Sequence, residues 1–258
     1  MMVNGHDPLT AALRGLGEEP GRDLTELVFA GWVRASAPTF GDVYTAFTDE
    51  GVSYVRTAES MHDDDAEFKN AFRQRFGRPL RKADRPPSGL LPALRGKPSP
   101  KLAFDLRELS EFERDVLTAT GRIPAGQTRP YGWVAWEIGR PKAVRAVGSA
   151  LARNPVPLLI PCHRVTRADG DPGEYVFGPQ AKERWLRAEG VNLDEVRDLA
   201  ESRVFYIGSD TTNIVCFPTC SNARRITPEH RRGFRAVADA QQAGYRPCRH
   251  CRPAAVAA

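Results

Sequence analysis

The stretch Ile160–Val165, Ile-Pro-Cys-His-Arg-Val, places one cysteine, Cys162, between a proline and a histidine. It follows an apolar run over Val156–Pro161, which we expect to be a buried strand or extended segment that the last proline ends. A cysteine in such a place can simply be a small buried apolar residue. It becomes a nucleophile only where a base and a third, orienting group lie close to it.

The composition is that of an ordinary globular protein. The 258 residues allow two domains or three small ones, and 41% of them are hydrophobic and 27% charged. No apolar run approaches the roughly 18 residues of a membrane span, and the N-terminus lacks the pattern of a secretory signal. Five cysteines in a chain of this length do not indicate a disulfide framework. We therefore expect a cytoplasmic protein in a reducing environment.

Arginine dominates the charge of the last part of the chain. Between residues 203 and 253, nine arginines and no lysine stand against three carboxylates, a balance of +6. The planar guanidinium pairs with phosphate oxygens through two parallel hydrogen bonds, so this segment suits contacts to a nucleic-acid backbone. A solvated basic face explains the charge equally well, and charge alone does not decide between the two.

The first hundred residues indicate a small α/β unit and a linker. An apolar-rich stretch over 24–33 suggests a strand, and the β-prone runs 43–47 and 52–55 suggest a hairpin. Three phenylalanines, four residues apart within 68–76, predict a helix packed on that hairpin. Five prolines within 84–101 mark a linker or an irregular connection.

The segment before Cys162 predicts a helix-turn-helix. A capping box at Ser110–Glu113 opens one helix, and two shorter helices follow over 131–138 and 141–151. The last of these is rich in small residues, which let a helix lie very close to something narrow, such as another backbone or a DNA groove. Helical hairpins are common, so this pattern is weak on its own.

Several elements are expected after Cys162. A glycine-rich loop over 168–178 leads to a helix over 179–189. Residues 192–203 are charged and suggest a joint, and residues 228–243 suggest a helix. Four cysteines enclose that last helix, as a Cys-x3-Cys pair at 216 and 220 and a Cys-x2-Cys pair at 248 and 251.

Four short motifs together resemble the O6-alkylguanine-DNA alkyltransferases: Pro-Cys-His-Arg-Val at 161–165, Arg-Ala-Val-Gly at 145–148, Asn-Pro at 154–155 and Glu-Gly at 189–190. The resemblance is strong over 102–190 and weak over the hairpin and helix before it. It implies single-use transfer of an alkyl group from O6 of guanine in double-stranded DNA to Cys162, after the nucleotide has been flipped out of the duplex. It also implies a ribonuclease H-like α/β unit over 24–83 and a catalytic, DNA-binding domain over 102–191.

The resemblance gives Cys162 the partners that a nucleophile needs. It implies that His163 is the base, acting through a water, and that Glu189 orients His163. It makes Tyr131 a contact to the flipped base that helps to neutralise the leaving guanine, although Tyr131 could be a core aromatic residue. Asn154 resembles the hinge that joins the recognition helix to the active-site loop.

The resemblance also implies a DNA-contacting helix and a base pocket. Arg145 fills the space that the flipped nucleotide leaves, beside Ala146 and Gly148 in the minor groove. The pocket is lined by Pro157, Tyr175, Val176 and Phe177. Two residues depart from the family pattern: Pro130 stands where serine is commoner, and Phe177 stands where glycine is usual. We expect Phe177 to narrow the pocket, so that methyl is transferred and a bulky benzyl group is accepted poorly.

The four C-terminal cysteines, Cys216, Cys220, Cys248 and Cys251, have the spacing of a tetrahedral zinc site. Thioredoxin-like redox chemistry would need a βαβ context that is absent from this sequence. Together with Thr211–Cys216 and Gly244–Pro253, they resemble the zinc-binding methylphosphotriester domain of Ada. That resemblance implies a domain over 203–254.

The Ada resemblance also implies that Cys216 accepts a methyl group from a DNA phosphate, with Arg224 and Arg225 as phosphate contacts. Zn²⁺ with four thiolates carries a formal charge of −2, which keeps Cys216 ionised; methylation leaves −1 and weakens repulsion from DNA. A purely structural zinc knuckle is the alternative. The module comes last in this chain, and Phe217 stands where an arginine is common.

We therefore expect a monomeric α+β DNA-repair protein, associated with the bacterial nucleoid, with alkyl acceptors at Cys162 and Cys216. One alternative is a methylation-damage sensor in which the zinc domain is structural or regulatory. Another is a hydrolytic Cys-His-Glu enzyme, which would turn over many times and leaves the motif at 145–148 unexplained.

Overall fold

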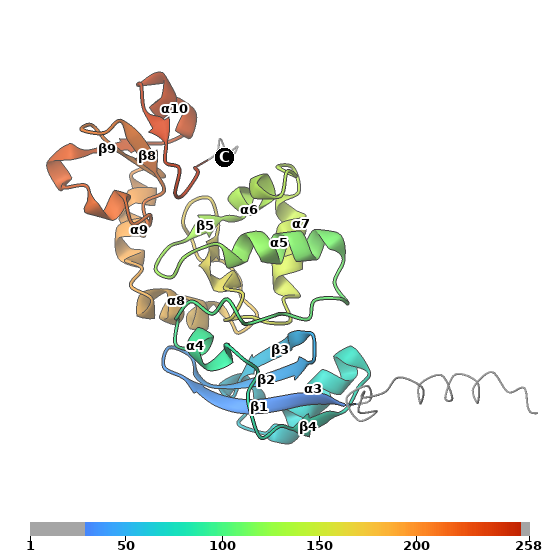
Figure 1. Cartoon of the computed structure of the whole chain (residues 1–258). Coiled ribbons are helices and arrows are strands. Elements are labelled where there is room, and N and C mark those ends of the chain that lie inside the picture. The colour runs from blue at the N-terminus through green and yellow to red at the C-terminus, as the bar shows by residue number, and fades with distance from the viewer. Residues whose placement is uncertain (1–28, 254–258) are drawn as a thin grey trace, which may run out of the picture.

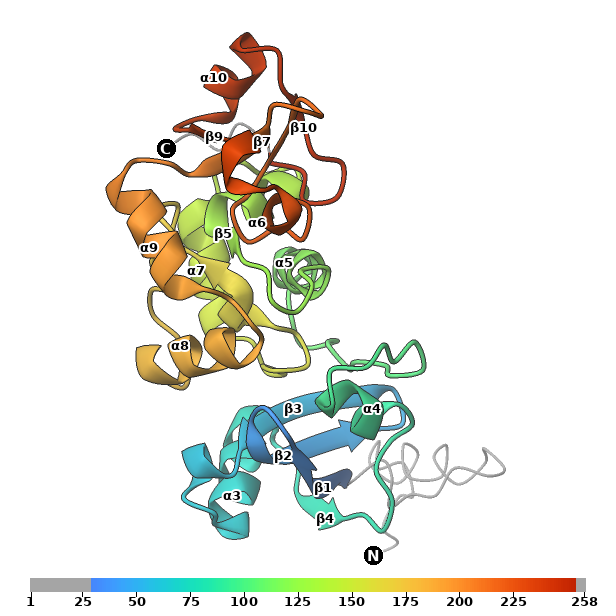
Figure 2. The ribbon, with the colours of Figure 1, turned by 90° about the vertical axis from the view of Figure 1, so that its left-hand side faces the viewer.

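The computed structural model describes residues 29–253, which form three successive parts of mixed helix and strand (Figure 1). A four-stranded sheet with one helix comes first, a helical part follows, and a second small sheet comes last. The helical part lies between the other two in both views of the ribbon (Figure 2). The expected α+β fold is confirmed.

The first part is a sheet in the order β3-β2-β1-β4. Strands β1 to β3 are antiparallel neighbours, so the expected hairpin is confirmed, and β4 runs parallel to β1. The expected strand at 24–33 begins outside the described residues and continues to 37. The bounds are β1 Ala30–Ala37, β2 Gly41–Thr48, β3 Gly51–Thr57, the 3-10 turn η1 Glu59–Met61, α3 Asp65–Phe76 and β4 Leu80–Lys82.

The two faces of this sheet pack against different partners, because successive residues of a strand point to opposite sides. Tyr44 and its same-face neighbours meet Phe68 and Phe72 of α3, which confirms the helix expected on the hairpin. Gly77 ends α3 with a positive φ of 68°, which a glycine adopts without strain. On the opposite face, Val43 and Val55 belong to the main core that continues into the helical part.

The helical part carries the predicted helix-turn-helix region. The capping box at Ser110 and Glu113 is present and opens α5. The helix expected to begin at residue 141 begins only at Val144, because residues 141 and 142 form a turn. The bounds are α4 Leu90–Leu94, α5 Glu111–Gly121, β5 Arg129–Pro130, α6 Tyr131–Glu137, α7 Val144–Ala152, the 3-10 turn η2 Cys162–Arg164, β6 Val165–Thr166, α8 Pro179–Ala188 and α9 Leu193–Glu201.

Two sequence-based predictions in this part are wrong. The run at 156–161 is buried but forms a tight turn with a bridge between Pro157 and Ile160, and Leu158 has a φ of 75°. Its prolines cannot donate to a ladder, so burial is kept without a strand. The joint expected at 192–203 contains helix α9, which Asn192 caps by accepting from the backbone N–H of Glu195.

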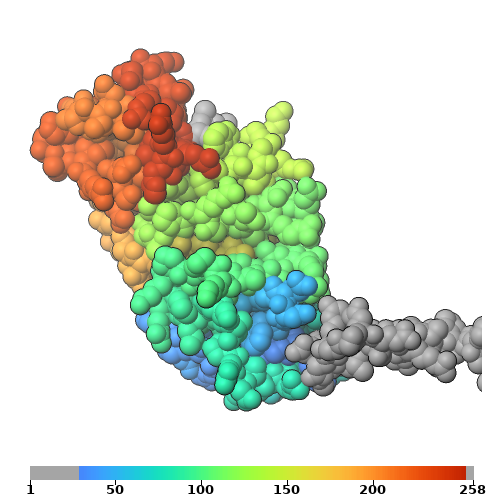
Figure 3. Space-filling model, in the orientation of Figure 1, coloured from blue at the N-terminus to red at the C-terminus, as the bar shows by residue number. Residues whose placement is uncertain are grey.

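The last part is a sheet in the order β10-β8-β7-β9. The helix expected over 228–243 is wrong in its first half, because Arg231–Phe234 pair with β7 as strand β9. In the space-filling view this part forms a lobe that abuts the helical part (Figure 3). The bounds are β7 Tyr206–Ser209, β8 Ile214–Cys216, the 3-10 turns η3 Ala223–Arg225 and η4 Pro228–His230, β9 Arg231–Phe234, α10 Val237–Gln242 and β10 Arg246–Pro247.

Within residues 29–253, the helices are too short or too polar to cross a bilayer.

Candidate functional site

Cys162 lies at the start of η2 and is 4% exposed. Asn154 holds it in place: the amide Nδ2 donates to the carbonyl of Ile160 at 3.0 Å and reaches Cys162 Sγ at 3.2 Å. The Asn154 Oδ1 in turn accepts from the backbone N–H of Val156 at 3.0 Å. Asn154 is 1% exposed. The side chain therefore joins the end of α7 to the turn that presents the sulfur.

His163, Glu189 and Arg164 form one buried network beside Cys162. His163 Nε2 lies 2.9 Å from Oε1 of Glu189. Arg164 donates two hydrogen bonds to the same carboxylate, from Nε to Oε2 at 2.9 Å and from Nη2 to Oε1 at 2.7 Å. Because a carboxylate accepts hydrogen bonds, the Nε2 of a neutral His163 carries the proton and its Nδ1 keeps a lone pair. That Nδ1 is buried and has no hydrogen-bond partner among the described residues.

The charges in this network suit a neutral base. Burial alone raises the pKa of Glu189, but the hydrogen bonds from His163 and Arg164 outweigh it and lower the pKa to about 2. Burial lowers the pKa of His163, so the imidazole is neutral at pH 7 and can accept a proton. Burial also raises the pKa of Cys162, against a smaller lowering by the Asn154 hydrogen bond. The sulfur therefore rests as a thiol and must lose its proton to react.

A buried lysine lies close to the same sulfur. Lys182 of α8 is fully buried, and its Nζ donates to the carbonyl of Val165 at 2.7 Å. The ammonium lies 5.8 Å from the ring centroid of Tyr131 and 5.9 Å from that of Tyr175. Burial lowers the pKa of Lys182 to about 8. At neutral pH this cation lowers the pKa of Cys162, and the thiolate form gains from it.

Aromatic rings surround His163. Phe40, from the turn between β1 and β2, and Trp185 of α8 each lie 5.9 Å from the His163 ring. Tyr175 lies 6.2 Å away, and its hydroxyl is buried without a hydrogen-bond partner among the described residues. Phe177 packs edge-on against Trp185, with ring centroids 5.4 Å apart. The turn between the first two strands thus supplies part of this wall.

The remaining expected pocket and DNA-contacting residues divide by exposure. Pro157 is buried, and Val176 is 39% exposed. On α7, Arg145 and Ala146 are exposed and Gly148 is half-buried. The opposite face of α7 is buried through Val147, Ala150 and Leu151. Among residues 29–253, the small-residue face is therefore accessible to a partner.

The four cysteines of the last part lie together. Their sulfurs are all within 4.8 Å of one another, and all four residues are buried. Strand β8 places Cys216 beside Cys248, because β10 pairs with β8 and the backbone N–H of Cys248 donates to the carbonyl of Val215 at 2.9 Å. Hydrogen bonds from Cys216 and Cys251 lower the pKa of Cys220.

This cluster fits a zinc ion. A tetrahedron with Zn–S bonds of about 2.3 Å has sulfur–sulfur edges of about 3.8 Å, close to the spacing here. Four buried cysteines with no disulfide between them are the donor set of a closed, structural type of zinc site. We conclude that Cys216, Cys220, Cys248 and Cys251 form a zinc-binding site.

Cys216 also borders a surface cavity of about 490 Å³. Polar side chains of Thr211, Arg225 and His230 line it with Cys216. Arg224, the neighbour of Arg225, points elsewhere and donates to the carbonyl of Gly190 at 3.4 Å. Of the two expected phosphate contacts, Arg225 is therefore the one beside the candidate acceptor.

Three residues that matter to these sites were not singled out from the sequence. Arg164 lies within the Cys162 motif, yet only the fold shows its two bonds to Glu189. From the sequence, Lys182 is expected to be an exposed lysine of a helix. It is buried because residues distant in the chain pack over it. Arg129 directly precedes Pro130, one of the two departures from the family pattern, and is buried in β5.

Two family models match the chain, one after the other. Residues 111–191 match the 6-O-methylguanine DNA methyltransferase, DNA binding domain. Residues 195–254 match the metal binding domain of Ada. The first covers Cys162 and its hydrogen-bonding partners, and the second covers the four clustered cysteines.

Curated relatives and solved structures agree with the first match. A methylated-DNA–protein-cysteine methyltransferase of Methanosarcina acetivorans is 46% identical over 91 residues, 34% of this chain and 58% of the relative. One from Mus musculus is 46% identical over 101 residues, 38% of this chain and 48% of the relative. The chain thus spans about half the length of the curated relatives it matches. A crystal structure of a variant of Mycobacterium tuberculosis OGT is 27% identical with a TM-score of 0.50, covering 62% of this chain and 93% of that one.

Proposed function

We propose that this chain, which joins a 6-O-methylguanine DNA methyltransferase DNA-binding domain to an Ada metal-binding domain, repairs alkylated DNA by transferring alkyl groups to its own cysteines. Cys162 takes the alkyl group from O6 of guanine in double-stranded DNA, and Cys216 takes a methyl group from a DNA methylphosphotriester. The protein acts as a monomer. The names of the relatives support repair over a damage sensor without transfer.

The observation that carries the first activity is the network of Cys162, His163 and Glu189. The Cys162 proton passes through a water to the free Nδ1 of His163, and the imidazolium so formed is stabilised by Glu189 at 2.9 Å. The sulfur attacks the alkyl carbon in line, a C–S bond forms, and the bond from that carbon to O6 breaks. The electron pair leaves with guanine, which takes up a proton, and Tyr131 is the candidate donor. A thioether has no good leaving group, so each Cys162 reacts once.

Access to the lesion is the role of α7. The target carbon lies inside the base stack, so the nucleotide must leave the duplex. Arg145, which is exposed, fills the vacated space, and the small residues Ala146 and Gly148 let the helix approach the minor groove. Asn154 links this helix directly to Cys162.

The second activity belongs to the cavity at Cys216. Bound zinc supplies a Lewis acid that keeps its four cysteine ligands ionised, so Cys216 needs no neighbouring base. Arg225 and His230 line the cavity and suit a phosphate ester. Attack of Cys216 on the methyl carbon forms a C–S bond, breaks the O–CH₃ bond and leaves an ordinary phosphate diester.

Intact-protein mass spectrometry tests both transfers. The full chain is incubated with double-stranded DNA that carries both lesions, and two added methyl groups are expected. Cys162→Ala removes one. Cys216→His keeps a zinc ligand but cannot form a thioether, and it removes the other. One methyl group that only Cys162→Ala abolishes would reduce the C-terminal domain to DNA binding, and no added mass would overturn the whole proposal.

A further inference from the structure

Arg129 is a buried cation at the boundary between the helical part and the metal-binding part. Arg129 is 2% exposed. Nη1 donates to the carbonyl of Thr128 at 2.7 Å and Nη2 to Oε1 of Gln127 at 2.8 Å, and both acceptors are neutral. Its Nε has no hydrogen-bond partner, and no carboxylate pairs with it, among residues 29–253. A buried charge is costly unless an opposite charge lies near it.

The opposite charge is provided by the cysteine cluster. The guanidinium carbon of Arg129 lies 5.3 Å from the ring centroid of Phe217, the residue that follows Cys216. Burial lowers the pKa of Arg129, and the attraction of all four cysteine sulfurs opposes that fall. Around one Zn²⁺ the four thiolates carry a formal −2, and Arg129 brings the buried total to −1.

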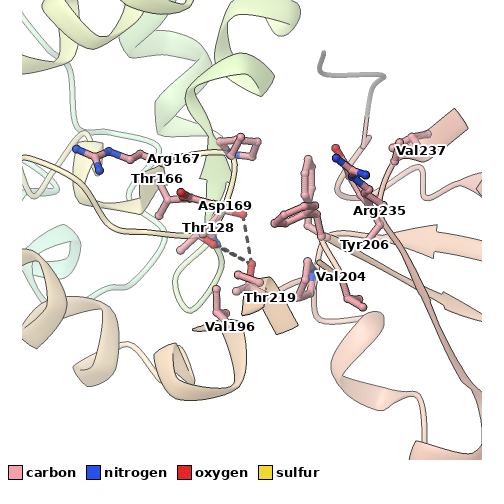
Figure 4. Close-up of a pocket in the computed structure, with 18 of the residues that line it drawn as sticks. Thr128, Thr166, Arg167, Asp169, Val196, Val204, Tyr206, Thr219, Arg235 and Val237 are labelled. Carbon is pink, nitrogen blue, oxygen red and sulfur yellow. Dashed lines mark hydrogen bonds between the residues drawn. The ribbon is translucent and has the colours of Figure 1, made fainter. Parts of the chain in front are cut away.

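The two residues before Arg129 contact residues that are next to the clustered cysteines in the chain. The backbone N–H of Thr128 donates to Oγ1 of Thr219, next to Cys220, at 2.9 Å, and the two hydroxyl groups lie 3.2 Å apart (Figure 4). Gln127 Nε2 lies 3.4 Å from Nε2 of His250, which precedes Cys251. Three consecutive residues thus meet the neighbours of three different cysteines.

The same short segment leads directly to the alkyl-acceptor site. Strand β5 pairs in parallel with β6, with Arg129 opposite Val165, three residues after Cys162. The carbonyl of Val165 holds the ammonium of Lys182. Tyr131 begins α6 immediately after β5. The backbone of β5 therefore joins Arg129 to Tyr131 and, across the pair with β6, to the carbonyl that supports Lys182.

We propose that Arg129 is the counter-ion of the metal centre, and that through β5 it couples zinc occupancy to the placement of Tyr131 and the reactivity of Cys162. The proposal rests on the zinc site described above and not on methyl transfer to Cys216. It also accounts for Phe217, which is buried against Arg129 and Tyr206 where the Ada pattern commonly has an arginine. This position serves the interface between the two parts.

Zinc affinity of the full chain is the first test, measured by competition with a chromophoric chelator. Arg129→Gln removes the buried charge and should weaken zinc binding by about 10- to 100-fold, the usual effect of losing a group that supports metal ligands. Arg129→Lys keeps the charge without the two-donor geometry of the guanidinium and should recover part of the lost zinc affinity. Arg249→Gln removes the same charge from an exposed residue between two ligands and should stay within about twofold of the wild type.

Two results would overturn the proposal that Arg129 is the counter-ion of the metal centre. One is Arg129→Gln binding zinc within twofold of the wild type. The other is Arg249→Gln losing as much as Arg129→Gln, which would assign the effect to net charge. If Arg129→Gln does not fold, the comparison of Arg129→Lys with the wild type is still decisive. Full wild-type zinc affinity with lysine is expected only if the two-donor geometry of the guanidinium is dispensable. A complete loss of zinc affinity with lysine would contradict a role for the charge.

The coupling has its own readout. Wild-type protein stripped of zinc and offered DNA with only O6-methylguanine should modify Cys162 at least about fivefold more slowly, and added zinc should restore the rate. In Arg129→Gln the rate should no longer depend on zinc. An unchanged rate in the zinc-free wild type would overturn the coupling, whereas loss of all transfer to Cys162 with zinc bound would count against the proposed function instead.

Discussion

Replacement of Glu189 by glutamine tests the catalytic network most directly. The Glu189 carboxylate is 7% exposed and accepts hydrogen bonds from His163 and from two nitrogens of Arg164. These hydrogen bonds lower its pKa from the ordinary 4.5 to about 2. Each tenfold change in acidity is worth about 1.4 kcal/mol, so the charge contributes about 3 kcal/mol to folding at neutral pH. That figure agrees with the roughly 3–5 kcal/mol lost when one partner of a buried ion pair is removed.

The sign follows from the lowered pKa. The contribution is present in full above pH 4.5 and is lost as the pH falls through about 2. Urea unfolding at pH 7, followed by tryptophan fluorescence, should therefore show Glu189→Gln less stable by about 3 kcal/mol, with a gap that narrows in acid. Transfer to Cys162 should slow by about 10²- to 10⁴-fold, because the imidazolium loses its carboxylate.

Glu183→Gln is the matched control. Glu183 lies on α8, the helix that ends just before Glu189, and pairs with Arg197 at 2.7 Å on the surface. An exposed pair contributes about 0–1 kcal/mol, so this variant should be nearly as stable as the wild type and react at its rate. A loss below 1 kcal/mol for Glu189→Gln, or a methyl-transfer rate near that of the wild type, would refute the reasoning.

Four further outcomes are expected. Asn154→Ala leaves the Ile160 carbonyl and the sulfur without their donor, so stability in urea should fall by about 1–3 kcal/mol and alkylation of Cys162 should slow. Because burial lowers the pKa of His163, the transfer rate should hold below pH 6.5 and fall only in stronger acid; a rate that halves above pH 6.5 would contradict a neutral, buried base. Lys182→Met should slow transfer at pH 7, and the difference from the wild type should diminish as the pH rises through about 8, where the lysine of the wild type loses its own charge. O6-Benzylguanine should react more slowly than O6-methylguanine in DNA, and Phe177→Gly should reduce that difference; equal rates in the wild type would show that Phe177 does not narrow the pocket.

Local signals in the sequence predicted the helices and the hairpin well. The capping box at Ser110 and the phenylalanines of α3 act within a few residues, and both elements form as expected. Signals that depend on distant pairing failed. Residues 231–234 become a strand only because β7 lies beside them, and the run at 156–161 turns because proline removes its ladder donors.

The candidate sites divide in the same way. The resemblance named Cys162, His163 and Glu189, and the fold brings the last two within 2.9 Å across 26 positions of the chain. Cysteine spacing alone indicated the zinc site, because four sulfurs in two close pairs have few other uses. The burial of Lys182 and Arg129 had no local signal: each is buried by segments far away in the chain, and a basic residue is ordinarily read as exposed.

The contacts between the helical part and the metal-binding part determine where this chain can be shortened or joined to another protein. Besides Arg129, the indole N–H of Trp133 donates to the carbonyl of Arg252 at 3.2 Å, and Arg252 pairs with Glu137 of α6. A shortened chain that stops after α8 would expose the Trp133 ring and leave Arg129 and Glu137 to solvent. The metal-binding part is therefore packed onto the helical part, and grafting it onto a different protein would require the receiving surface of β5 and α6 to be transplanted with it.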